Sequence, residues 1–80
     1  MHPVERYRKA QGWTQVDLAK HLGVSANSVR AWEAGAEPRP SRLSKLAEVL
    51  RVDRLQLLDE IVAWKESNVR GAKEESRRAT

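Results

Sequence analysis

The sequence contains no cysteine and no phenylalanine, and each absence removes a class of function. Without cysteine there is no disulfide framework and no thiolate nucleophile, and a zinc site would depend on two histidines, His2 and His21, that lie nineteen positions apart. Without phenylalanine, and without sheet-borne aromatic side chains, the stacking platforms that bind single-stranded RNA are not expected. We therefore expect neither a metal site nor an RNA-binding surface.

Long hydrophobic runs are missing as well, since none approaches the roughly 20 apolar residues that a membrane span requires. The charged opening of the chain, residues 2–6, lacks the apolar stretch of a signal peptide. No glycine-rich phosphate loop is present, and neither histidine has a recognisable nucleophile or carboxylate partner in the sequence. We expect a cytoplasmic protein that has no cofactor, no metal, no membrane contact and no enzymatic activity.

The chain is short and basic. Its 80 residues suffice for one small domain. A single core of this size seldom contributes more than about 3–5 kcal/mol of net stability, so dimerisation would be a natural supplement. The formal net charge of +4 and the pI near 10.0 suit a polyanionic partner, although many soluble domains are mildly basic. More informative is the grouping of Arg30, Arg39 and Arg42 near the middle of the chain.

Two short helices joined by a glycine turn are predicted in the first half of the chain. The first is expected over residues 15–22 and the second over residues 26–34, each preceded by a hydroxyl side chain, Thr14 and Ser25, that can accept from the free amides of a first helical turn. Between them, Gly23 can adopt the left-handed conformation that a sharp turn needs. Two short helices in this arrangement are suited to placing side chains in a DNA groove.

Three further helices complete the predicted all-α fold. One is expected over residues 3–11 and another from a Ser41 cap to residue 50, after a loop that contains two prolines. A fifth begins at residues 52–53. Its inward-facing residues are expected to be Leu55, Leu58 and Val62.

Beyond Ala63 the apolar pattern fades and charged residues dominate. The sequence is therefore divided into a domain over residues 1–62 and a charged C-terminal extension over residues 63–80, partly helical or disordered. Two interpretations of the extension stay open: a frayed tail, in particular over residues 70–80, or a continuation of the fifth helix to about Asn68 that offers apolar side chains to a partner. Those side chains are Leu57, Ile61 and Trp64.

The segment from Thr14 to Gly35 resembles the helix-turn-helix of the lambda-repressor-like, or Cro/C1-type (XRE-family), DNA-binding domains. The residues that carry the resemblance are Gln15, Ala19, Gly23, Val29 and Trp32. It extends over about residues 4–58, upstream through Val4, Tyr7, Arg8 and Gly12 and downstream through Glu33, Ala34, Gly35, Pro38, Pro40, Leu43, Leu46, Ala47 and Leu50. The resemblance implies a compact five-helix domain of a prokaryote or phage, associated with the nucleoid.

The helix expected over residues 26–34 has a face suited to base edges. If Val29 and Trp32 point inward, a polar face with small neighbours points outward. On that face an asparagine can pair with the N6 and N7 atoms of adenine, and an arginine with the O6 and N7 atoms of guanine. The alternative is an ordinary solvated helix face. The residues expected at base edges are Asn27, Arg30, Ala26 and Ala31.

Other polar residues are expected at DNA phosphates. Gln15 lies in a first helical turn, where backbone and side-chain amides can reach a phosphate, although it could also be a plain surface residue. Arg39 stands between two prolines that hold its backbone extended. Arg42 could assist it or simply be exposed. The phosphate-contacting set is Gln15, Ser25, Ser28, Arg39 and Arg42.

The resemblance further implies a partly buried salt bridge between Arg8 and Glu33, which would tie the first helix to the third. Its role is structural.

These observations together predict a sequence-specific regulator of transcription that binds double-stranded DNA, in particular a repressor, with its third helix in the major groove. One such helix specifies few base pairs, so we expect a homodimer on an inverted-repeat operator. The dimer contact is predicted at Leu57, Ile61 and Trp64. The alternative is a protein-interaction module of the same fold, such as an antitoxin or a small adaptor, with the C-terminal extension as the contact to a protein partner.

Overall fold

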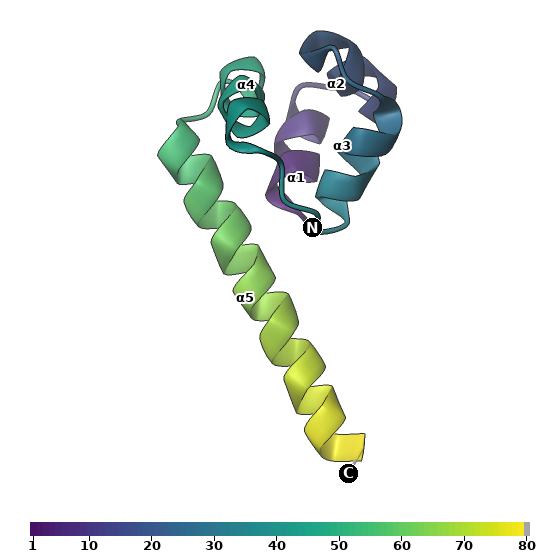
Figure 1. The fold of residues 1–80 in the computed structure, drawn as a ribbon, viewed down its shortest axis with the longest axis vertical. Helices are drawn as coiled ribbons and strands as arrows, with labels where there is room; N and C mark the ends of the chain where they lie inside the picture. Colours follow the sequence, from purple (N-terminus) through teal and green to yellow (C-terminus); the bar gives the residue numbers. More distant parts are fainter. Residues whose placement is uncertain (80) are drawn as a thin grey trace.

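The computed structural model describes the backbone of residues 1–79 and the side chains of residues 1–68. Within that part the protein is all-helical, as predicted. Its elements are α1 (Pro3–Ala10), α2 (Gln15–Leu22), α3 (Ala26–Glu33), α4 (Pro40–Leu50) and α5 (Arg54–Ala79). Helices α1 to α4 gather at one end of the molecule, and α5 begins beside α4 and runs away from them (Figure 1).

The turn between α2 and α3 forms as the sequence predicts. The hydroxyl of Thr14 accepts from the amide of Asp17 at 3.1 Å, while the Asp17 carboxylate accepts from the amide of Thr14 at 2.9 Å. Ser25 accepts from the amide of Ser28 at 3.3 Å and so begins α3. Gly23 ends α2 with φ 71°, a left-handed conformation that costs glycine little because it has no Cβ atom. Local signals therefore set the geometry of this pair of helices.

Other helix ends differ from the prediction. Ser41 does not cap α4, because the helix already begins at Pro40, whose fixed φ suits a first turn, with Arg39 as the cap residue. Helix α1 is capped by His2, whose Nδ1 atom accepts from the amide of Val4 at 3.1 Å. Burial lowers the pKa of His2 below its ordinary value, which favours the neutral ring, whose Nδ1 atom can accept.

One hydrophobic core joins all five helices. Its largest fully buried side chains come from α1, α2, α3, α4 and α5 in turn, so each helix contributes an anchor. The complete set of buried apolar residues is Val4, Leu18, Ala19, Leu22, Val29, Trp32, Leu43, Leu46, Ala47, Leu50, Leu57 and Ile61.

The predicted orientation of α5 is wrong. Leu55 is 67 % exposed, and Leu58 and Val62 are exposed too, whereas Leu57 and Ile61 lie in the core. Both sets of residues have helical spacing, so periodicity alone could not decide which one faces inward. The contacts of α5 with α1 and α4 decide it. Leu57 and Ile61 are consequently not free to form the predicted dimer contact, and Trp64 is half-buried.

The backbone of α5 continues past residue 62 without a break. The predicted boundary between domain and extension therefore falls inside a helix. That division stays a prediction.

Candidate DNA interface

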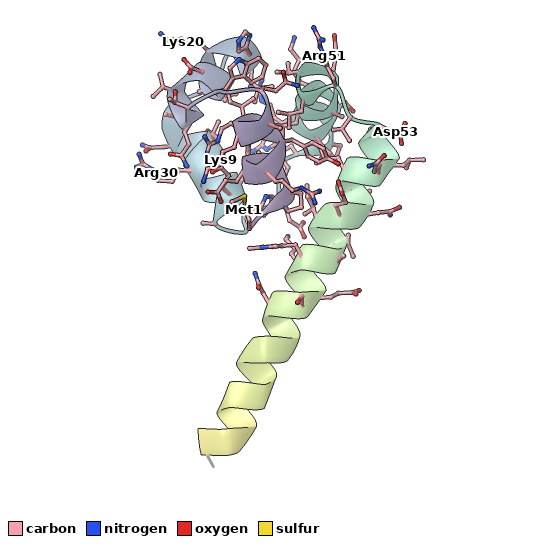
Figure 2. The ribbon with its side chains drawn as sticks, turned by 180° about the vertical axis from the view of Figure 1, so that it is seen from behind. Met1, Lys9, Lys20, Arg30, Arg51 and Asp53 are labelled. Atoms are coloured by element: carbon pink, nitrogen blue, oxygen red, sulfur yellow. The ribbon has the colours of Figure 1, made fainter. Side chains whose placement is uncertain are left out.

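Helix α3 presents its polar face to solvent, as its periodicity predicts. Val29 is fully buried and Trp32 is 8 % exposed, while Asn27 and Arg30 on the other side are exposed. Figure 2 shows Arg30 on the outer side of the globule, away from α5. The Nη1 atom of Arg30 lies 3.4 Å from Oδ1 of Asn27, a long hydrogen bond that holds the two polar groups side by side. Both residues are thus placed where a base edge could reach them.

The two alanines expected at base edges differ in position. Ala31 is exposed, and its methyl group leaves room for close approach to a groove. Ala26 is half-buried and packs against the core, because it opens α3 at the turn. Contact of either alanine with a base stays a prediction.

Four of the five residues predicted at phosphates line one hollow. Its volume is about 490 Å³, and it lies between the start of α3 and the segment that leads into α4. Two hydroxyls, of Ser25 and Ser28, lie 3.2 Å apart. Arg39 and Arg42 are the other two of these four residues. We refer to this feature as the phosphate hollow; the remaining lining residues are Gly23, Val24, Trp32 and Glu37.

Gln15, the fifth residue predicted at phosphates, does not line the phosphate hollow. Its side-chain amide donates to Oε1 of Glu33 at 3.1 Å, so that group is already engaged within the protein. The backbone amide of Gln15, in the first turn of α2, is the group left for a phosphate. Contact of Gln15 with DNA stays a prediction, now through the backbone.

The salt bridge between Arg8 and Glu33 is present. The Nε atom of Arg8 donates to Oε2 of Glu33 at 2.8 Å and Nη2 donates to Oε1 at 3.1 Å, and the two side chains are only 8 % and 6 % exposed. Nη1 of Arg8 donates to the carbonyl of Trp13 at 2.8 Å. The hydrogen bonds that Arg8 donates to the Glu33 carboxylate raise the pKa of the Arg8 guanidinium above its ordinary value. This network holds α1 against the end of α3 and so fixes the helix that carries the polar face.

Sequence reasoning missed one ion pair beside the phosphate hollow. The Nζ atom of Lys65, on α5, lies 2.7 Å from Oε1 of Glu37 and lowers the pKa of that carboxyl. Twenty-eight positions separate the two residues in the sequence. No local pattern links residues so far apart, and only the placement of α5 brings them together.

Among the side chains that the structure describes, no group of three or more histidine, cysteine, aspartate or glutamate residues is arranged to hold a metal ion. Over the same described residues, no helix is both long and apolar enough to span a membrane.

The chain matches a known protein family. A model described as "Helix-turn-helix" matches residues 4–57, more than half of the chain, including all of α2 to α4, most of α1 and every predicted DNA-contacting residue. No curated protein and no solved structure matches the chain significantly.

Proposed function

This chain belongs to the Cro/C1-type helix-turn-helix family of DNA-binding regulators, and on that premise we propose that it is a sequence-specific repressor of transcription with α3 in the major groove of double-stranded DNA. One observation carries the proposal. Asn27 and Arg30 are exposed on α3, and the phosphate hollow adjoins the start of the same helix. Contacts to phosphates fix how a protein sits on the duplex, and contacts to bases read the sequence. Groups suited to both tasks thus adjoin a single helix.

The phosphate hollow supplies suitable groups for an anion. Its two serine hydroxyls lie in and before the first turn of α3, where the partial positive charge of the helix favours an anion. Its two arginines can donate to phosphate oxygens through a fork of N–H groups. A phosphate held there would place the exposed face of α3 against the adjacent groove.

Substitutions on α3 should change which DNA sequence is preferred. Asn27→Ala and Arg30→Ala should each lose about 1–3 kcal/mol at one base pair, while Arg39→Ala should weaken binding to all sequences alike. Because the two side chains on α3 are hydrogen-bonded to each other, the double variant should lose less than the sum of the single losses. Sequencing the fragments that each variant retains from a random pool of duplexes measures these preferences.

Arg54→Ala is the matched control for Arg39→Ala. Arg54 is exposed and follows Asp53, which lies across the globule from Arg30 (Figure 2). It should leave both affinity and preference close to wild type. If the Asn27 and Arg30 variants select the same sequences as the wild type, then α3 does not read bases.

We also propose a homodimer, because α3 offers only two polar side chains for base contacts and a single copy would specify too few base pairs. The contact that we propose is the exposed face of α5, where Leu55, Leu58 and Val62 lie at positions i, i+3 and i+7. Such an apolar stripe is suited to a second copy of the same helix across a two-fold axis.

Leu58→Glu should convert the dimer to a monomer in analytical ultracentrifugation, because it puts two carboxylates into an apolar contact. Ala63→Glu adds the same charge to an exposed position beside the stripe and should stay dimeric. A wild-type protein that is monomeric both alone and on DNA would contradict the dimer. It would favour the second candidate, an interaction module such as an antitoxin or adaptor whose protein partner covers the apolar face of α5.

A further inference from the structure

Helix α5 holds the segment between α3 and α4 at two neighbouring points. The ring of Trp64 lies over Gly35, with two ring carbons 3.4 and 3.5 Å from the position that a Cβ atom would take. One residue later, Lys65 forms its ion pair with Glu37 at 2.7 Å. The same segment leads into Arg39. The position of α5 is therefore coupled directly to one wall of the phosphate hollow.

Glu37 is the acidic residue among the side chains that line the phosphate hollow, where it accompanies Arg39 and Arg42. Its side chain is 80 % exposed, so it has room to turn, whereas the Lys65 side chain is 28 % exposed and more firmly held. A carboxylate and a phosphate both bind guanidinium groups through a pair of oxygen atoms. A Glu37 carboxylate that turned into the phosphate hollow would compete with a phosphate for these arginines.

We propose that Lys65 is a positioning residue for DNA binding, which holds the Glu37 carboxylate aside and keeps Arg39 and Arg42 free for a phosphate. When Lys65 is removed or engaged elsewhere, Glu37 turns into the phosphate hollow, pairs with the arginines and excludes DNA. This inference rests on the proposed function. It makes α5 a control element for the phosphate hollow, acting without any contact of its own with DNA.

A measurement without DNA tests the movement of Glu37. In the wild-type protein the hydrogen bond from Lys65 lowers the pKa of the Glu37 carboxyl, which can be followed by NMR titration. In Lys65→Met the pKa should remain low, because the arginines replace the lysine. Adding Arg39→Ala and Arg42→Ala to Lys65→Met should return it to its ordinary range. If Lys65→Met alone returns the pKa to that range, Glu37 does not turn to the arginines and the inference is wrong.

A double-mutant cycle on random-sequence duplex DNA tests the consequence. Lys65→Met should weaken binding at low salt roughly three- to tenfold more than Arg54→Met, which removes the same charge elsewhere. In a Glu37→Gln background, Lys65→Met and Arg54→Met should weaken DNA binding equally, because the competing carboxylate is gone. Lys65→Arg should restore wild-type binding.

The outcomes separate the inference from the function on which it rests. An equal loss from Lys65→Met in the two backgrounds would show that Lys65 acts only as one more positive charge, and the inference would fall while DNA binding stood. If the wild-type protein binds no duplex, the proposed function falls, and the NMR titration still decides whether Glu37 moves. Because an exposed ion pair contributes little to folding, these variants should stay folded.

Discussion

Replacing Arg8 by alanine is expected to lower the free energy of unfolding by about 3–5 kcal/mol, because it leaves the carboxylate of Glu33 buried without its counter-charge. Both side chains are almost fully buried, and the pair has bidentate geometry. A domain of this size has a net stability of about the same magnitude. The single substitution should therefore leave a large part of the protein unfolded at 25 °C, which urea denaturation followed by circular dichroism would show.

Two further variants separate the effect of burial from the effect of charge on stability. Arg6→Ala breaks the exposed pair between Arg6 and Glu60 and should shift the urea midpoint little. Arg8→Met combined with Glu33→Leu removes both buried charges and should recover most of the stability. Recovery should be incomplete, since the carbonyl of Trp13 and the side chain of Gln15 are left without their partners. An Arg8→Ala protein as stable as Arg6→Ala would contradict a buried ion pair.

Binding to duplex DNA is expected to fall by about two to four powers of ten between 50 and 200 mM salt, a slope of about −4 to −7 in log K against log salt. The reason is the release of counterions from some four to eight phosphates per dimer. The phosphate hollow and the first-turn amide of α2 are the groups in each copy that we expect to contact them. Fluorescence anisotropy of a labelled random-sequence duplex, measured over this salt range, gives the slope.

The arginines of the phosphate hollow should account for part of that slope. Arg39→Ala and Arg42→Ala should each make it shallower by about one unit for every phosphate that the variant no longer neutralises. Arg54→Ala again serves as the charge-matched control and should leave the slope nearly unchanged. A slope near zero, or no retention at low salt, would exclude DNA as the partner and leave the interaction module as the better proposal.

The geometry of α2 and α3 could be predicted because it depends on neighbours in sequence. The caps at Thr14 and Ser25 and the left-handed Gly23 act within one turn of helix, and the inward pair Val29 and Trp32 follows once that turn is set. The gathering of polar residues around the phosphate hollow was predicted only as a set of separate roles. Its shape depends on where the segment before α4 lies.

The orientation of α5 was beyond prediction because both apolar stripes on that helix have helical spacing. Periodicity in the sequence does not indicate which stripe faces the core. Long-range contacts decide it, such as the 2.6 Å hydrogen bond from the hydroxyl of Tyr7 to Glu60. The pair between Lys65 and Glu37 was missed for the same reason, since it exists only once α5 is correctly placed.

The inward stripe of α5 also bears on where the chain can be cut without opening the core. The family match ends at residue 57, yet Ile61 is 4 % exposed in the core, and Trp64 touches the ring of His2 at a centroid distance of 4.6 Å. A fragment cut at the family boundary would open the core and uncover the cap of α1. Expression designs and domain fusions should therefore keep the chain through Lys65 and attach partners beyond it.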